Sequence, residues 1–289
     1  MADRPFPPPG ACDCHVHVVG PRTRFPLAAA RRYTPLDAPV AALAAMLECL
    51  RLDRVVLVQP SFYGTDNACM LDALVRLPAA RGVAVLPQAV APAEIDDLHA
   101  RGVRGLRVNI ATSGSAPLDA MRRDMEAAAA LCARHGWHVQ IFVPSDSIEP
   151  LAPILLGLPV PTVIDHFGLI APGVEDDALR ALLRLIETGR IWVKISGAYR
   201  IADDPADPRI DPLARRLVQA NPERIVWGSD WPHTPKHGHG HFGPDEERPY
   251  QDLDTRGLLA LVPRWLKDDR RVEQVLVTNP ARLYDFPPG

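Results

Sequence analysis

Two histidines separated by a single residue, His15 and His17, stand in a short apolar stretch near the beginning of the chain. In an extended strand, side chains two residues apart point to the same side and lie roughly 6–7 Å from each other. Both imidazoles can therefore be directed at one point, which suits the binding of a divalent metal ion or of a substrate oxygen. Asp13 has the same parity as the two histidines, so we expect it on the same inward face. Cys12 and Cys14 then belong to the opposite face.

Polar side chains also stand where three other apolar stretches end. Arg107 and Asn109 end one stretch, His166 ends a second, and Asp230 ends a third. A carboxylate among histidines suits general base catalysis, and a guanidinium group holds a carboxylate through paired N–H donors. Taken singly, Asp230 has an alternative role as a helix N-cap, Arg107 as a salt bridge at the rim and His166 as a buried core histidine. Their shared position at strand ends favours a single site.

The elements that must position these residues are short Val- and Ile-rich stretches alternating with Ala- and Leu-rich stretches of helical periodicity. The predicted strands are 11–18, 54–60, 83–90, 103–109, 137–143, 161–166, 191–196 and 224–230. The predicted helices are 40–50, 67–77, 93–100, 117–135, 147–156, 176–188, 205–220 and 255–267, and a further helical segment begins near 271.

Strict alternation of eight strands with eight helices predicts an α/β fold, a closed (β/α)8 TIM barrel in a single domain, residues 1–289. An open doubly wound sheet is the alternative. No GxGxxG or GxxxxGK[ST] motif follows any predicted strand, so the barrel is favoured. In such a barrel the carboxyl ends of the strands form the mouth, where the polar residues would meet.

Other polar residues are given structural roles. Lys194 has inward parity, and we expect a buried ion pair with Asp13 because an unpaired interior charge is costly. His135 and His138 lie between a helix and a strand and are interpreted as structural. The histidine-rich loop 233–241 is interpreted as a solvated loop over the mouth, with a lid or a second metal site as alternatives.

Composition narrows the class of protein. The 289 residues carry 32 basic and 35 acidic side chains, a net charge of −3, with 47% hydrophobic residues. This balance gives no electrostatic footprint for nucleic acid or for an acidic membrane surface. Five scattered cysteines predict free thiols in a reducing cytoplasm, and no apolar stretch has the length of a membrane span. A homo-oligomer is left open.

Three motifs, DCHVH, IDHFG and WGSDWPH, together resemble the amidohydrolase superfamily. With YGTDN, GVRGLRVN and KISGAYR, the resemblance covers nearly the whole chain. The branch resembled is a group of lactone-converting enzymes that includes 2-pyrone-4,6-dicarboxylate lactonase, sugar-acid lactonases and galactarolactone isomerase. We therefore expect a cytoplasmic hydrolase of aromatic or sugar-acid catabolism that opens a carboxylated lactone.

The expected mechanism gives each residue a role. Asp230 is the general base that activates water, and His15, His17 and His166 stabilise the oxyanion. Arg107 and Arg200 are expected to hold substrate carboxylates, with Asn109 beside Arg107 on its strand. The resemblance adds Ser61, Tyr33 and His233 as orienting contacts.

The resemblance also bears on metals. Members with two metals have a carboxylated lysine or a glutamate on the fourth strand and a histidine on the fifth. This chain has Arg107 and Asn109, then Gln140 and Phe142, so a binuclear site is not expected. The resemblance favours hydrolysis with no cofactor. The alternative is one zinc ion held by His15, His17, His166 and Asp230.

Two departures from the dicarboxylate lactonase pattern concern the substrate. Residues 110–114 contain no basic side chain, and Phe142 stands where the resemblance implies a tyrosine. We therefore expect a lactone with one carboxylate, such as a sugar-acid lactone or a substituted muconolactone. Alternative functions are a zinc-dependent decarboxylase, a lactone isomerase and a catalytically silent barrel that binds an anion.

Overall fold

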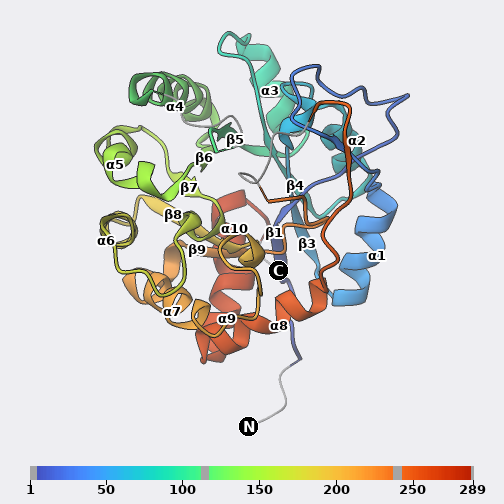
Figure 1. Cartoon of the computed structure of the whole chain (residues 1–289). Helices are drawn as coiled ribbons and strands as arrows, with labels where there is room; N and C mark the ends of the chain where they lie inside the picture. The colour runs from blue at the N-terminus through green and yellow to red at the C-terminus, as the bar shows by residue number, and fades with distance from the viewer. Residues whose placement is uncertain (1–4, 112–116, 237–242, 288–289) are drawn as a thin grey trace.

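The computed structural model describes residues 5–111, 117–236 and 243–287. Eight parallel strands form a barrel with helices around it, and Figure 1 looks onto one end of this barrel. The barrel strands are β1 (Cys12–Val16), β3 (Arg54–Val58), β4 (Ala80–Ala84), β5 (Val103–Asn109), β6 (His138–Phe142), β7 (Thr162–Ile164), β8 (Ile191–Ser196) and β9 (Ile225–Gly228). They pair in chain order.

The barrel closes between its first and last strands. The backbone N–H of His17 donates to the carbonyl of Trp231 at 2.8 Å, and the N–H of Asp230 donates to the carbonyl of His15 at 2.8 Å. The predicted (β/α)8 barrel is therefore confirmed. Closure also brings Asp230 next to His15 and His17, although more than two hundred residues separate Asp230 from these histidines in the chain.

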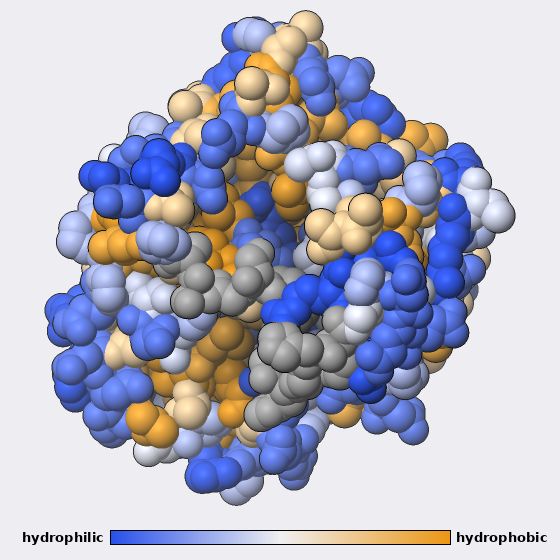
Figure 2. All heavy atoms as spheres, turned by 45° about the horizontal axis from the view of Figure 1, so that its top comes forward, coloured by the Kyte–Doolittle hydropathy of each residue, from blue (hydrophilic) through white to orange (hydrophobic). Residues whose placement is uncertain are grey.

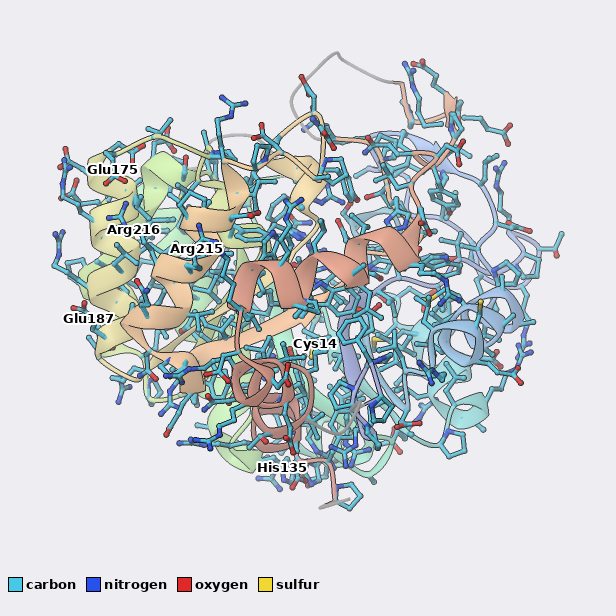
Figure 3. The ribbon with its side chains drawn as sticks, turned by 90° about the horizontal axis from the view of Figure 1, so that it is seen from below. Cys14, His135, Glu175, Glu187, Arg215 and Arg216 are labelled. Carbon is cyan, nitrogen blue, oxygen red and sulfur yellow. The ribbon has the colours of Figure 1, made fainter. Side chains whose placement is uncertain are left out.

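A ring of helices covers the outside of the barrel (Figure 3). α6 shows why these segments are helical. The Asp176 side chain caps its first turn by accepting from the N–H of Leu179 at 2.9 Å, and Leu179, Leu182 and Leu185 are buried on one face. Glu175, which precedes α6, forms an ion pair with Arg216 of the neighbouring α7. The helices are α1 (Val40–Leu50), α2 (Ala68–Arg76), α3 (Pro92–Ala100), α4 (Leu118–Cys132), α5 (Ile148–Gly157), α6 (Asp177–Glu187), α7 (Ile210–Ala220), α8 (Thr255–Leu266), α9 (Asp269–Glu273) and α10 (Asn279–Tyr284).

The predicted strand at 83–90 is wrong in its position, because β4 is Ala80–Ala84. The Asn67 side chain accepts from the N–H of Val85 at 3.1 Å and donates to its carbonyl at 2.8 Å, so a side chain replaces the neighbouring strand there. Pro87 follows, which has no N–H for a ladder. A two-stranded sheet of β2 (Thr34–Pro35) and β10 (Glu247–Arg248) was not predicted, since two residues show no periodicity.

The prediction that Cys12 and Cys14 lie on the opposite face of β1 from His15 is wrong. The pairing of β1 with β3 has an irregular register between Asp13 and Val16. Such a bulge breaks the alternation of side chains. Cys12 and Cys14 therefore pack in the barrel interior, and Figure 3 shows Cys14 near the middle of the barrel. His15 also points inward, as predicted.

Lys194 is buried in the barrel, as expected, but the predicted ion pair with Asp13 is wrong. Its Nζ donates to Gln140 Oε1 at 2.7 Å and to a backbone carbonyl of β1 at 2.8 Å, and lies 3.9 Å from Asp165 Oδ1. Asp13 instead accepts from the backbone N–H of Ser229 at 2.9 Å. The bulge in β1 is the reason, because it separates the facing of Asp13 from that of the residues after it.

The expectations for His135, for His138 and for the cysteines agree with the structure. His135 lies at the barrel end opposite the mouth (Figure 3), with Nε2 2.7 Å from Asp96 Oδ1. His138 is buried, and its ring packs edge-on against Tyr284. All five cysteines are free. Within the described ranges, no helix has the length and apolar character needed to cross a membrane.

Candidate active site

One polar pocket lies where the strands end at the barrel mouth. Its volume is about 20 Å³, which is room for roughly one water molecule. Seven of the predicted site residues line it: His17, Tyr33, Ser61, Arg107, Asn109, His166 and Arg200. Pro60, Phe62, Phe142 and Thr234 complete the lining.

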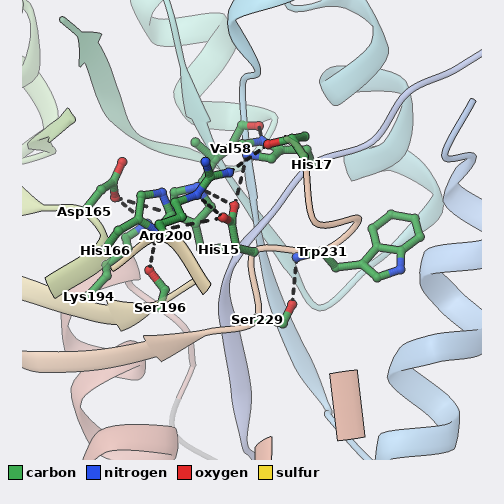
Figure 4. A network of polar contacts seen from close by, with 12 residues as sticks. His15, His17, Val58, Asp165, His166, Lys194, Ser196, Arg200, Ser229 and Trp231 are labelled. Carbon is green, nitrogen blue, oxygen red and sulfur yellow. Dashed lines mark hydrogen bonds and ion pairs between the residues drawn. The ribbon is translucent and has the colours of Figure 1, made fainter. Parts of the chain in front are cut away.

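Three histidines, His15, His17 and His166, converge at this pocket (Figure 4), and Asp230 lies among them. Asp230 Oδ1 lies 3.7 Å from His15 Nε2 and 3.5 Å from His17 Nε2, and Asp230 Oδ2 lies 4.0 Å from His166 Nδ1. His15 and Asp230 are fully buried, while His17 and His166 reach the pocket itself. The structure thus brings together the four residues that the sequence placed on three different strands.

The turn after β9 positions Asp230. Its φ of 65° is in the left-handed region, which few residues other than glycine adopt. Asp230 Oδ2 accepts from the Tyr199 hydroxyl at 2.7 Å and from Arg200 Nε at 2.5 Å, whereas Oδ1 has no hydrogen-bond partner. Burial alone would raise the pKa of Asp230, but the Arg200 guanidinium and the neighbouring imidazoles outweigh it and hold this pKa well below its usual range. The carboxylate is therefore ionised.

Asp165 belongs to the same network, although the sequence did not single it out. Its carboxylate lies 3.4 Å from His15 Nδ1, 3.4 Å from Arg107 Nη2 and 3.9 Å from Lys194 Nζ. Burial would raise the pKa of Asp165, but His15 and Lys194 outweigh it and hold this pKa well below the usual value. Simple alternation sets Asp165 and His166 on opposite faces. The left-handed backbone of His166, with φ of 51°, lets both reach the site.

The histidines differ in what fixes them. His17 Nδ1 is 2.7 Å from the Val58 carbonyl, so this nitrogen carries the proton and Nε2 faces Asp230. His166 Nδ1 is 3.0 Å from the Ser196 hydroxyl. Burial lowers the pKa of His166 to about 4 and that of His15 well below its usual value, so both are neutral at ordinary pH.

Two groups of predicted residues lie elsewhere. His233 is not among the residues that line the pocket: its Nε2 is 3.0 Å from the Thr255 hydroxyl, at the start of α8, and its expected contact with substrate stays a prediction. His237, His239 and His241 of the histidine-rich loop lie outside the described residues. Residues 112–114, part of the segment after β5 in which no basic side chain is present, also lie outside the described residues. Tyr199 and Thr234 were missed, since their contacts with Asp230 and Arg200 depend on the barrel closing.

The cluster fits a single metal ion in the chemistry of its donors. One ligand atom from each of His15, His166 and Asp230 lies within 4.8 Å of the others. His15 Nε2 and Asp230 Oδ1 are buried without hydrogen-bond partners. Two imidazole nitrogens and a carboxylate oxygen are ligands that zinc accepts.

Comparison with known proteins identifies the family. The amidohydrolase family model matches residues 12–286. This chain belongs to the amidohydrolase family. The predicted superfamily resemblance is thus confirmed, and the site described above occupies the mouth of an amidohydrolase barrel.

Several relatives of this amidohydrolase are similar over most of their length. It is 36% identical to 4-sulfomuconolactone hydrolase of Hydrogenophaga intermedia, covering 96% of this chain and 89% of the relative. It is 34% identical to 2-pyrone-4,6-dicarboxylate hydrolase of Comamonas testosteroni, covering 96% and 90%. A crystal structure of a probable 2-pyrone-4,6-dicarboxylic acid hydrolase from Acinetobacter baumannii, with citric acid bound, superposes with a TM-score of 0.77 at 27% identity, covering 96% of this chain and all of that one.

Proposed function

We propose that this amidohydrolase hydrolyses a carboxylated lactone. One observation carries the proposal: the ionised, buried Asp230 presents an unbonded oxygen to His15 and His17 beside a pocket that also contains Arg107. This arrangement combines a base, groups that can stabilise an oxyanion and an anchor for a carboxylate. The names of the relatives, which are hydrolases of a sulfomuconolactone and of a pyrone dicarboxylate, support the same reaction class.

The attacking water is held by two acceptors. His17 carries its proton on Nδ1, so its Nε2 is an acceptor. This Nε2 lies 3.5 Å from Asp230 Oδ1, which is also an acceptor. A water molecule on the pocket side can donate one hydrogen to each. Its lone pair then points at the ester carbonyl carbon, and Oδ1 takes the proton as the new C–O bond forms.

Stabilisation of the oxyanion falls to the neutral imidazole of His166. The Ser196 hydroxyl can donate to His166 Nδ1, which leaves the Nε2–H of His166 as a donor toward the pocket. Asp165 Oδ1 lies 3.4 Å from His15 Nδ1 and favours a proton on that nitrogen. A preorganised donor in a water-poor site is worth several kcal/mol to a developing charge. The tetrahedral intermediate then breaks its ring C–O bond, and the alkoxide that leaves takes the proton from Asp230.

Arg107 is the better of the two expected carboxylate anchors. Its Nε has no hydrogen-bond partner, and its two hydrogen bonds are long: 3.3 Å from Nη1 to the Gln59 carbonyl and 3.4 Å from Nη2 to Asp165 Oδ2. Arg200 is already engaged, since Nε donates to Asp230 and Nη2 donates to the Thr234 hydroxyl at 2.7 Å. We therefore assign Arg107 to the substrate carboxylate and Arg200 to the positioning of Asp230. Burial raises the pKa of Tyr33 to about 12, so its hydroxyl stays available as a donor.

The proposal includes hydrolysis without a required metal. Two buried guanidinium groups, Arg107 and Arg200, border the pocket and make it unfavourable for an added cation. If an ion is bound, His15, His166 and Asp230 would hold it, and it would supply Lewis-acid polarisation of the ester carbonyl.

The test is acid release by the chelator-treated protein on a panel of carboxylated lactones, including muconolactone, sugar-acid lactones and the pyrone dicarboxylate. Turnover that survives chelation and falls by about 10²–10⁴ in Asp230→Asn supports the proposal. Thr255→Val, which removes only the partner of His233 beyond the pocket, is the control for general damage and should keep its rate.

Other outcomes assign the alternative functions. A rate restored only by zinc makes the His15, His166 and Asp230 cluster a metal centre. Release of carbon dioxide indicates the decarboxylase, and a rearranged lactone with no new acid indicates the isomerase. Thermal stabilisation by carboxylates with no turnover of any panel member indicates a silent anion-binding barrel.

A further inference from the structure

A larger hollow opens beside the catalytic pocket, and the proposed mechanism does not use it. Its volume is about 780 Å³, and Phe142 and Arg200 line both spaces. We call it the outer hollow. In Figure 2 the molecule is hollowed near the centre of the view, with hydrophilic residues at the depth and hydrophobic residues beside them.

The chemistry of the outer hollow differs from that of the catalytic pocket. Leu169, Pro172 and Val174, which follow β7, and Ile201, which follows β8, give it an apolar wall. At its edge, Lys236 Nζ donates to Asp203 at 2.7 Å, and Arg209 is paired with Asp207. Arg32 and Arg200 also line it, so the space offers a ligand an apolar wall with charged side chains beside it.

Leu169 in this wall has an unusual backbone. Its φ is 53°, in the left-handed region where glycine or asparagine costs less than a branched apolar residue. The sequence nevertheless places a leucine there, half-buried against the outer hollow. Backbone strain of this kind is often located at functional sites. At this point a leucine supplies apolar wall that a glycine or an asparagine would not supply.

The sizes of the two spaces indicate where a substrate lies. The catalytic pocket holds roughly one water molecule, so only the reacting edge of a lactone reaches it. The rest of the substrate must extend beyond it. The outer hollow shares Phe142 and Arg200 with the pocket, and its volume of about 780 Å³ is in the upper part of the range for drug-sized ligands. A small dicarboxylate would leave most of the apolar wall uncovered.

We propose that the outer hollow is a subsite for a hydrocarbon arm of several carbons on the carboxylated lactone. The substrate class is then an alkyl- or aryl-substituted lactone acid, with its carboxylate at Arg107 and its arm against Leu169, Val174 and Ile201. This inference rests on the proposed lactone hydrolysis, and the experiment separates the two.

The experiment compares kcat/KM for muconolactones that carry a methyl, propyl or hexyl group on the ring. Each methylene that becomes fully buried favours binding by about fourfold. With the five added methylenes about half-buried in the open hollow, kcat/KM should rise on the order of 10- to 100-fold from methyl to hexyl. Val174→Asp should reduce this rise to less than about threefold, because a carboxylate then faces the hydrocarbon arm. Val174 is 41% exposed, so the variant is expected to fold. Val75→Asp on α2, at an exposed valine outside the outer hollow, is the matched control and should keep the full rise.

A second measurement does not depend on turnover. Calorimetry with methyl-, propyl- and hexylsuccinate should show affinity that increases with chain length in the wild type and in Val75→Asp, but not in Val174→Asp. Hydrolysis of the methyl compound without any gain from longer arms would overturn the subsite and leave the lactonase proposal intact. Chain-length-dependent binding with no hydrolysis would overturn the lactonase and support the subsite. If neither rate nor affinity depends on the arm, the subsite is wrong.

Discussion

Gly197 lies directly against the proposed catalytic groups, and adding one methyl group there tests the geometry of the site. A Cβ at this position would be 2.9 Å from Asp230 Oδ2 and 3.0 Å from His166 Nδ1. Oδ2 cannot swing away freely, because Tyr199 and Arg200 both donate to it. In Gly197→Ala, Asp230 and His166 must therefore shift by a few tenths of an ångström, and their hydrogen bonds must lengthen.

The magnitude has two parts. Gly197 has φ of 55°, and an alanine there costs about 1–2 kcal/mol in the left-handed region. The close approach adds about 1–3 kcal/mol, as overpacking does in a core. Gly189→Ala is the matched control, since Gly189 has φ of 73° but its Cβ would meet nothing closer than 3.6 Å. Gly189→Ala should show only the first cost.

The assays are urea unfolding and steady-state hydrolysis of the best lactone in the panel. We expect the free energy of unfolding of Gly197→Ala to be at least about 1 kcal/mol lower than that of Gly189→Ala. Its kcat should fall at least about tenfold, because small displacements of a base and an oxyanion donor slow the chemical step. The control should keep its kcat. If Gly197→Ala matches Gly189→Ala in stability and keeps kcat within about twofold, the assigned roles of Asp230 and His166 are refuted.

Three further predictions follow from charges in the barrel. Arg107→Lys should raise KM for a carboxylated lactone about tenfold with little change in kcat, because lysine keeps the charge but loses the paired donors; steady-state kinetics would contradict this if KM stayed constant. Asp165→Asn should lower the free energy of unfolding by about 3–5 kcal/mol, since Lys194 and Arg107 lose a buried counter-charge; a change below about 0.5 kcal/mol in urea unfolding would argue against the network. Burial lowers the pKa of His138 to about 3, so unfolding binds a proton below pH 6.5 and stability is lost as the pH falls toward 3. Between pH 7.5 and pH 5, the free energy of unfolding of the wild type should fall by roughly 2 kcal/mol more than that of His138→Phe. Equal decreases in the two proteins would show that His138 is not buried as a neutral group.

The sequence by itself determined the architecture and most of the pocket. Hydrophobic periodicity is a local property, so the alternation of strands and helices could be read without knowing any contact. Parallel strands in a barrel also end at a common mouth. His17, Arg107 and His166 could therefore be assigned to one site from their positions at strand ends alone, and the structure places all three at the pocket.

Only the tertiary structure decided how these groups pair. The bulge in β1 brings His15 and Cys14 to the same side, which strict alternation forbids. Asp165 replaces Asp13 as the carboxylate nearest Lys194. Arg200 is bonded to Asp230, thirty residues away in the chain, and so is assigned to the base and not to the substrate. Such pairings depend on which side chains the closed barrel brings within hydrogen-bond distance, and no local pattern of the sequence encodes that distance.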